Sequence, residues 1–386
     1  MGQAAKRSSS SSNFQVLHAF MAGKYGKVPV GTLLVDNGLL YGTTNFGGTA
    51  NKSCYPGNGC GLVFSFDGTT ESVVYDFKGL ATGSRPYAGL IDVNGTLYGT
   101  TQTGGKKNEG GVFSLTPSGK ETLVVAFTGK NGNDARAGLT SIGGSIYGTT
   151  YYGGAAGVGT VFSISASGTE KVLHSFQSGT DGEWPLGTLL SANNVLYGTT
   201  SLGGSKRAGT VFQINPDGTG YSVLYTFKGG KTDGAFPFAG LTELNGTLYG
   251  TTQEGGAHNK GTVFALTTSG SETLLHSFGA TGDGEQPFAG LTVLNGTLYG
   301  TTAYGGTGGK DANPNVKRKP TSEGTIYTIS PSGSEQVLHS FTGGPGGRVP
   351  YANLTVMGSS LYGVTIWGGN PKGFSGGVGT IFEYTP

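Results

Sequence analysis

The sequence has few charged residues, few cysteines and no long apolar run. Charged residues are 12% of the 386 positions and the formal net charge is +2, so no concentrated basic face for nucleic acid is expected. No apolar run reaches the roughly 18 residues that a membrane-spanning helix needs. The Ala/Ser-rich residues 1–13 lack the apolar core of a signal peptide and are expected to form a disordered leader.

Motifs of common catalytic and cofactor sites are also missing. There is no Gly-x-Ser-x-Gly, His-Glu-x-x-His or phosphate-binding loop. The two cysteines, Cys54 and Cys60, have no partnering histidine and could not complete a zinc site, so neither a metal nor a cofactor is expected. Both lie in one Gly/Pro/Asn-rich loop, where they form either a short disulfide, typical of an oxidising compartment, or two free thiols.

No segment places apolar residues at a helical period, so little helix is expected. Instead, four short patterns each occur seven times, roughly fifty residues apart. They read Pro-x-Ala-Gly-Leu-Thr, Leu-Tyr-Gly-Thr-Thr, Gly-Thr-Val-Phe and Val-Leu-His-Ser-Phe. Each is rich in strand-forming residues. Asn-Gly, Ser-Gly and Asp-Gly pairs separate them, and such pairs are strong hairpin signals. The 76 glycines therefore punctuate strands.

These repeats predict an all-β, seven-bladed β-propeller with four antiparallel strands per blade. The chain enters at the fourth pattern, residues 14–20, and leaves at the third, residues 380–382. The N-terminal strand should therefore complete the last blade and close the ring, which removes exposed sheet edges. A solenoid that does not close is the alternative. One domain is expected over residues 14–386, with the Ala-Gly-Leu-Thr strand innermost and the phenylalanine-ending strand outermost.

The connections between the second and third strands differ in length. Those at residues 49–60, 307–323 and 370–378 are long, and up-and-down topology places all of them on one face. They either carry function on a rigid scaffold or reflect neutral drift in surface loops. The basic residues of the second long loop are interpreted as a solvated surface; they are Lys310, Lys317, Arg318 and Lys319.

Aromatic residues precede the Gly-Gly pairs that end the second strands on this face. They are Phe46, Tyr151, Tyr152, Tyr304 and Trp367. Aromatic rings at a channel mouth can stack on sugar rings, which makes these residues candidates for ligand binding. The alternative is that they pack between blades.

Candidate catalytic groups are sparse. Four of the five histidines share one outer-strand position where tyrosine or valine stands in other repeats, so that position is structural. His258, in a loop, is the single candidate acid/base, with a solvated loop residue as the alternative. Loop carboxylates could form a glycosidase-type pair; the candidates are Glu183, Glu254, Glu285 and Asp311. The repeated loop aspartates are interpreted as turn-capping residues; they are Asp134, Asp181, Asp233 and Asp283.

The combination Leu-Tyr-Gly-Thr-Thr-x-x-Gly-Gly, Gly-Thr-Val-Phe, Val-Leu-His-Ser-Phe and Asp-Gly-x-x-Pro-x-Ala-Gly-Leu resembles the GloVer tandem-repeat family of bacterial proteins. The match extends over residues 14–385 and is strongest around Tyr249 and Tyr299. The resemblance implies a propeller-type repeat protein that is exported. It implies no shared catalytic residues.

Three functional hypotheses follow. The first is a non-catalytic binding or scaffold propeller, secreted, cell-surface or periplasmic, that engages a polysaccharide or another extracellular polymer through the face with the long loops. The second is a polysaccharide lyase or glycoside hydrolase. The third is a scaffold for an extracellular protein partner. A monomer without nucleic-acid partners or a membrane span is expected in each case, and fold alone does not choose among them.

Overall fold

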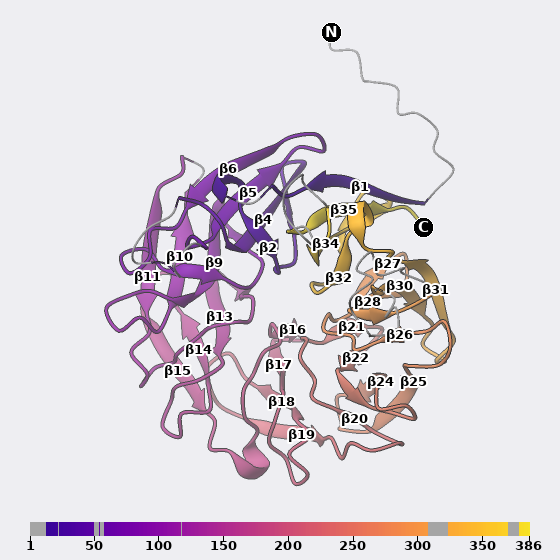
Figure 1. Ribbon diagram of the computed structural model, residues 1–386. Coiled ribbons are helices and arrows are strands. Elements are labelled where there is room, and N and C mark those ends of the chain that lie inside the picture. Colours follow the sequence, from indigo (N-terminus) through magenta and orange to yellow (C-terminus); the bar gives the residue numbers. More distant parts are fainter. Residues whose placement is uncertain are drawn as a thin grey trace.

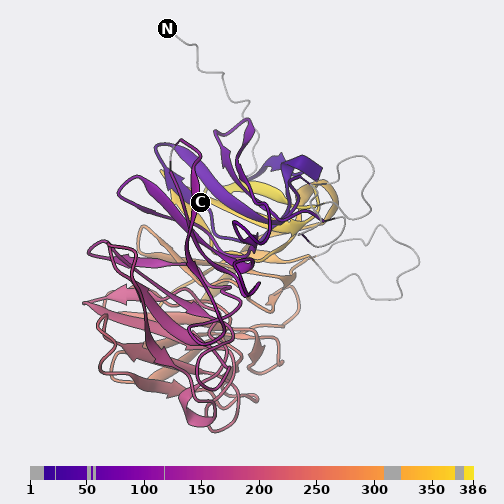
Figure 2. The ribbon, with the colours of Figure 1, turned by 90° about the vertical axis from the view of Figure 1, so that its left-hand side faces the viewer.

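A computed structural model describes residues 13–21, 23–49, 54, 58–116, 118–307, 323–369 and 378–386. Seven antiparallel sheets stand around a central channel, so the predicted all-β, seven-bladed propeller is confirmed (Figure 1). Seen from the side, the ring is a flattened body (Figure 2). The helical residues in the described part of the chain form three short 3-10 turns: η1 (Gly23–Tyr25), η2 (Gly179–Asp181) and η3 (Gly344–Gly346).

Each blade contains four strands, which are described as innermost, second, third and outermost according to their distance from the channel. The innermost strands are β3 (Leu34–Asp36), β8 (Ile91–Val93), β12 (Thr140–Ile142), β16 (Leu190–Ala192), β21 (Thr242–Leu244), β27 (Thr292–Leu294) and β33 (Thr355–Met357). The second strands are β4 (Leu39–Phe46), β9 (Thr96–Thr103), β13 (Ser145–Thr150), β17 (Val195–Thr200), β22 (Thr247–Thr252), β28 (Thr297–Thr302) and β34 (Ser360–Trp367).

The outer half of each blade follows the same order. The third strands are β5 (Leu62–Phe66), β10 (Gly111–Leu115), β14 (Thr160–Ile164), β18 (Thr210–Ile214), β24 (Thr262–Thr267), β30 (Thr325–Ile329) and β35 (Thr380–Tyr384). The outermost strands are β6 (Glu71–Asp76), β11 (Glu121–Ala126), β15 (Glu170–Ser175), β19 (Ser222–Thr226), β25 (Glu272–Ser277), β31 (Glu335–Ser340) and β1 (Phe14–Ala19). Short segments extend some blades at the channel mouth: β2 (Lys27–Pro29), β7 (Ser84–Pro86), β20 (Gly234–Ala235), β23 (Glu254–Gly255), β26 (Gly284–Glu285), β29 (Tyr304–Gly305) and β32 (Arg348–Pro350).

The ring closes as the repeat order predicts. Strand β1 from the N-terminus pairs antiparallel with β35 from the C-terminus, with Phe14 opposite Tyr384 and Ala19 opposite Thr380. Figure 1 shows the indigo β1 alongside the yellow β35. The last blade therefore takes its outermost strand from the opposite end of the chain, and the first and last blades are neighbours.

The repeated motifs explain how the blades are packed. At Gly42 of the Leu-Tyr-Gly-Thr-Thr pattern, a Cβ atom would collide with the Phe64 ring on the third strand. The Thr43 hydroxyl donates to the Ala88 carbonyl of the next blade at 2.8 Å. The same bond recurs at Thr100, Thr199 and Thr251. The motif thus makes room for an aromatic core and joins neighbouring blades.

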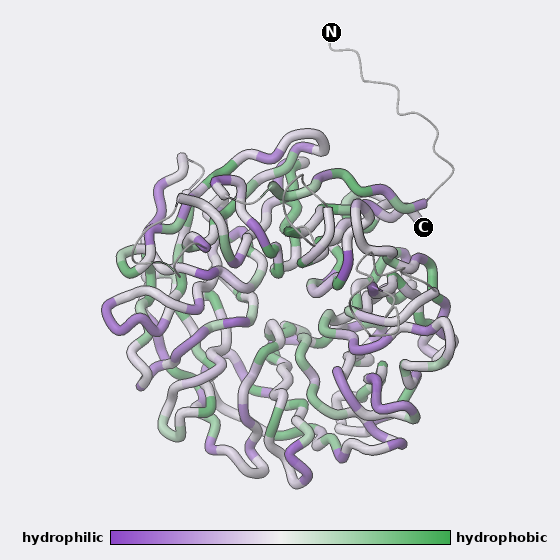
Figure 3. Tube along the Cα trace, viewed as in Figure 1, coloured by the Kyte–Doolittle hydropathy of each residue, from purple (hydrophilic) through white to green (hydrophobic). Residues whose placement is uncertain are grey.

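The hydrophobic core is divided among the seven blade junctions. At each junction the phenylalanine after an outermost strand packs edge to face on a third-strand aromatic ring of the next blade, with centroids 5.0–5.4 Å apart. Hydrophobic and hydrophilic stretches alternate around the ring (Figure 3). Edge-to-face aromatic pairs are favourable beyond the area that they bury, so the junctions hold the ring together.

The structure also bears on the predictions about the two cysteines and about membrane-spanning segments. Cys54 and Cys60 form a disulfide, which confirms one of the two alternatives. Among the described residues, no helix is long and apolar enough to cross a membrane. Residues 1–12 of the expected leader and the basic residues 310 and 317–319 lie outside the described part of the chain.

Candidate ligand-binding site

One side chain from each blade lines the central channel at the variable position of the Pro-x-Ala-Gly segment. This channel ring consists of Val30, Tyr87, Arg136, Leu186, Phe238, Phe288 and Tyr351. The cavity that it lines has a volume of about 450 Å³. Backbone crowding sets the width of the channel, because a Cβ on Gly31 would meet the Ala88 backbone of the next blade at 2.5 Å.

Aromatic side chains cover one side of this cavity. Phe288 stacks on Tyr351 with centroids 4.7 Å apart, and Phe238 meets Phe288 edge to face at 5.5 Å. The Tyr351 ring also faces Tyr87, and the two hydroxyls are hydrogen-bonded at 3.1 Å. Burial, followed by the nearby Tyr87, raises the pKa of Tyr351 far above its ordinary value. Its hydroxyl therefore stays neutral and can donate a hydrogen bond to a ligand.

Arg136 is the one charged member of the channel ring. Its Nε and Nη2 atoms donate to Oδ2 of Asp134 at 3.0 and 2.6 Å. The guanidinium also lies over the Tyr151 ring, 4.1 Å from its centroid. Burial lowers the pKa of Arg136, but the ion pair with Asp134 outweighs that effect and the net shift is upward. The other carboxylate oxygen of Asp134, Oδ1, is buried and has no hydrogen-bond partner among the described residues.

Three aromatic residues form a rim cluster above this ion pair: Tyr151, Tyr152 and Trp184. The Tyr151 and Tyr152 centroids are 4.5 Å apart, and Trp184 lies 5.5 Å from Tyr151 and 6.1 Å from Tyr152. Tyr152 is 37% exposed. The cluster combines an exposed aromatic surface with a half-buried Arg–Asp pair, which is a common arrangement at sites for small polar ligands.

At the rim of the channel, one residue in each blade has a left-handed backbone conformation. Asp134 and Trp184 have φ angles of 57° and 60°, and the corresponding residue of every other blade is also left-handed. Such angles are uncommon outside glycine. Each of these residues donates its N–H to a carbonyl of the preceding blade, as Trp184 does to Val158 at 2.9 Å. This inter-blade hydrogen bond holds the rim side chains in a fixed position, and because it recurs in all seven blades the left-handed conformation belongs to the blade architecture.

The aromatic residues singled out from the sequence lie on this same face but in different blades. Tyr152 belongs to the rim cluster. Phe46 lies between two cations, with Arg85 5.2 Å and Lys27 5.9 Å from its ring centroid. Tyr304 and Trp367 are 36% and 40% exposed. The structure therefore brings Tyr151 and Tyr152 together and leaves the other three as separate surface positions.

The candidate catalytic residues do not converge on the channel ring. His258 is exposed in the loop between β23 and β24, and among the described residues no hydrogen bond or ion pair reaches its imidazole. Glu183 accepts from the Ser178 hydroxyl at 2.7 Å and forms an ion pair with Arg207. Glu285 is paired with Lys260 at 2.8 Å. Glu254 lies in β23, and Asp311 is outside the described residues.

The loop aspartates divide into two groups. Asp181, Asp233 and Asp283 each accept a backbone N–H of their own loop, as the turn interpretation predicts. Asp134 does not belong with them, because the equivalent turn position in its blade is Asn131, whose side chain accepts from the Thr128 N–H. Asp134 instead occupies the rim position and pairs with Arg136.

Neither Trp184 nor any residue of the channel ring was identified as a candidate from the sequence. The Pro-x-Ala-Gly segment recurs as a structural motif, and its x position carries no constant residue that would indicate a site. That position holds valine, leucine, phenylalanine, tyrosine or arginine while its neighbours barely change. Variation at one position within a constant motif is the signal that could have identified it.

Comparisons with known proteins support the fold. A family model described as the Gloeobacter/Verrucomicrobia repeat matches residues 2–162 and 122–312. No curated protein matches the sequence.

Among solved structures, one of streptogramin B lyase is 16% identical with a TM-score of 0.61, covering 96% of this chain and 97% of that one. An oligogalacturonate lyase in complex with manganese is 10% identical with a TM-score of 0.52, covering 96% and 90%. The computationally designed Ika8 protein is 13% identical with a TM-score of 0.52, covering 96% and 100%. Similarity at this level shows the shared propeller architecture alone, because one fold hosts many functions.

Proposed function

The chain belongs to the Gloeobacter/Verrucomicrobia repeat family, and we propose that it is a binding propeller that holds a carbohydrate at the mouth of its central channel. The observation that carries this proposal is the rim cluster of Tyr151, Tyr152 and Trp184 above the Arg136–Asp134 pair. Sugar rings present apolar C–H faces and many hydroxyls. They therefore match aromatic rings flanked by a few fixed polar groups.

Each part of the site has a role in this proposal. The exposed Tyr152 ring stacks on one sugar unit, and the Trp184 ring, which stands nearly perpendicular to Tyr152, contacts the edge of that unit. The Arg136 guanidinium lines the cavity and has N–H groups beyond the two that it donates in its ion pair, and one of these donates to a sugar hydroxyl. The aromatic wall of Phe288 and Tyr351 receives the end of the ligand that enters the channel. A chain end or a short oligosaccharide fits a cavity of about 450 Å³ better than the middle of a long polymer does.

The disulfide supports the proposal that the protein works outside the cytoplasm. Cys54 and Cys60 are both buried, at 6% and 0% exposure, and pack in the core between the first two blades. Disulfides persist mainly in oxidising compartments. Carbohydrate polymers outside the cell are then the accessible ligands.

The test is a glycan array followed by affinity measurement for the best ligand, with released sugars assayed in parallel. We expect retention without product. Trp184→Gly should weaken binding by roughly tenfold or more, equivalent to about 1.4 kcal/mol, and should fold because glycine favours the left-handed conformation of that residue. Tyr152→Ala should also weaken binding.

Val73→Ala serves as the matched control, because Val73 is an exposed hydrophobic residue on the outermost strand β6. It should bind as the unaltered protein does. Equal binding by Trp184→Gly and Tyr152→Ala would refute the assignment of the rim cluster. Released product would show an enzyme, and retention of no glycan would remove the carbohydrate proposal.

A further inference from the structure

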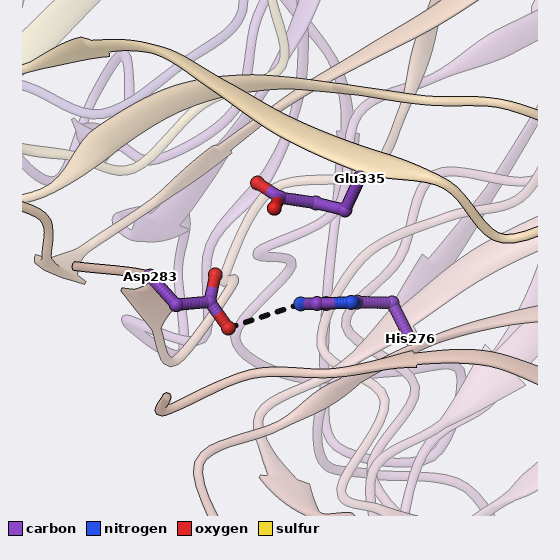
Figure 4. Close-up of side chains that lie close together, drawn as sticks. All are labelled: His276, Asp283 and Glu335. Atoms are coloured by element: carbon purple, nitrogen blue, oxygen red, sulfur yellow. Dashed lines mark hydrogen bonds and ion pairs between the residues drawn. The ribbon is translucent and has the colours of Figure 1, made fainter. Parts of the chain in front are cut away.

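A second constellation of chemical interest lies away from the channel, at the junction between the fifth and sixth blades. His276 from β25, Asp283 from the following loop and Glu335 from β31 point toward one another (Figure 4). The His276 Nε2 and Asp283 Oδ2 atoms are 3.0 Å apart. One ligand atom from each of the three side chains lies within 4.8 Å of the other two.

These groups form an N/O ligand set for a divalent transition ion. Zn²⁺ takes imidazole nitrogen and carboxylate oxygen at about 2.0–2.2 Å, so in its usual tetrahedral geometry two ligand atoms are about 3.4 Å apart. The ligand atoms here lie within 4.8 Å of one another, so the Glu335 carboxylate would have to move by roughly 1–1.5 Å toward the ion. Three protein ligands would leave a position for water, as in open zinc sites.

Two of the ligands are already arranged for such an ion. Asp283 is held by backbone N–H groups of Gly279 and Gly284, at 3.1 and 2.6 Å, so its carboxylate has a fixed orientation. The Oε1 atom of Glu335 is buried and has no hydrogen-bond partner among the described residues, and the same is true of the equivalent Glu272 at the preceding junction. The feature specific to this junction is that an imidazole nitrogen and two carboxylates converge, which is a donor set that a cation can complete.

The preceding junction provides an internal comparison. There, Asp233 and Glu272 occupy the positions of Asp283 and Glu335, but Tyr225 stands where His276 would be. The Tyr225 hydroxyl lies 3.0 Å from Asp233 Oδ2 and 3.3 Å from Glu272 Oε2. Burial and the two carboxylates raise the pKa of Tyr225 well above its ordinary value. A neutral phenol joins the carboxylates by hydrogen bonds and is a poor metal ligand, so one side chain distinguishes the two junctions.

We propose that His276, Asp283 and Glu335 bind one Zn²⁺ ion that cross-links the fifth and sixth blades. The site is independent of the proposed carbohydrate site, because none of its residues lines the channel. It also departs from the expectation, based on the sequence, that the chain carries no metal site.

The experiment uses the full-length protein, treated with a chelator and then titrated with ZnCl₂ in a calorimeter, with melting followed in parallel. We expect saturable binding of one ion and a melting temperature that rises with Zn²⁺ concentration. His276→Tyr copies the preceding junction and should therefore fold, yet it should lose this binding. Glu335→Gln keeps the shape of the side chain and should weaken binding at least tenfold.

The reciprocal variant is the strongest test. Tyr225→His should create a second site with Asp233 and Glu272 and raise the stoichiometry to two ions. Ca²⁺, which prefers all-oxygen coordination, should not compete. The proposal is overturned if the unaltered protein and His276→Tyr take up the same amount of Zn²⁺, or if Tyr225→His adds no ion.

Discussion

Replacing Glu121 with glutamine should make the stability of the protein less dependent on pH. Glu121 begins β11 at the junction between the first two blades, where its Oε2 accepts from the Tyr75 hydroxyl at 3.3 Å. Its Oε1 is buried without a partner among the described residues. Burial raises the pKa of Glu121 from 4.5 to about 7, although the Tyr75 hydrogen bond partly opposes the shift. The folded protein therefore holds a proton here that the unfolded chain has already lost.

The sign and size of the effect follow from proton linkage. Because the pKa is higher in the folded state, Glu121 contributes stability that is fully present below about pH 4.5 and is lost as the pH rises through about 7. One pKa unit corresponds to about 1.4 kcal/mol, so the full shift would amount to about 3 kcal/mol. Solvent reaches part of this side chain, and screening reduces the expected value to about 1–2 kcal/mol.

Urea unfolding at pH 5 and pH 8 measures this contribution. At pH 5 the Glu121→Gln variant and the unaltered protein should have similar free energies of unfolding. At pH 8 the variant should be more stable by about 1–2 kcal/mol, because it carries no buried charge. Val73→Ala, at an exposed and non-titrating position of β6, should show no pH-dependent difference. If Glu121→Gln shifts stability equally at both pH values, the reasoning is wrong.

Two further predictions concern the ring and its disulfide. Gly89→Ala should destabilise the protein by about 1–3 kcal/mol in thermal or urea unfolding, because its Cβ would collide with the Thr32 backbone carbonyl of the adjacent blade. The control Gly290→Ala should cost less stability, because its Cβ meets its nearest atom at 2.9 Å. Equal losses of stability in the two variants would contradict this account of the channel width. Replacing Cys54 and Cys60 with serine should lower stability by about 2 kcal/mol, the loop-closure value for so short a loop, and an unchanged urea midpoint would argue against it.

Much of the fold could be predicted because its determinants are local and recur in every repeat. The alternating residues of Leu-Tyr-Gly-Thr-Thr and the Asn-Gly turns specify hairpins within a few residues of chain. The split of the last blade between the two termini specifies closure, and the β1–β35 pairing confirms it. The disulfide was one of two alternatives, because two nearby cysteines show proximity but not oxidation state.

The candidate sites required the tertiary structure. Tyr87 and Tyr351 are 264 positions apart in sequence and share a hydrogen bond across the channel. Trp184 meets Tyr151 only because adjacent blades place their rims side by side. The outer histidines occupy equivalent positions in the repeat pattern. Among the described residues, however, only His276 forms a cluster with both an aspartate and a glutamate of the next blade.

The amino-acid sequence alone specifies the blade, the number of blades and the way that the ring closes, because hydrogen bonding and side-chain alternation within a hairpin depend on neighbouring residues. Which of the variable residues meet depends on the folded ring. Every such contact joins different repeats, and its geometry depends on the width of the channel and the angle between blades, which the packing of all seven junctions sets together.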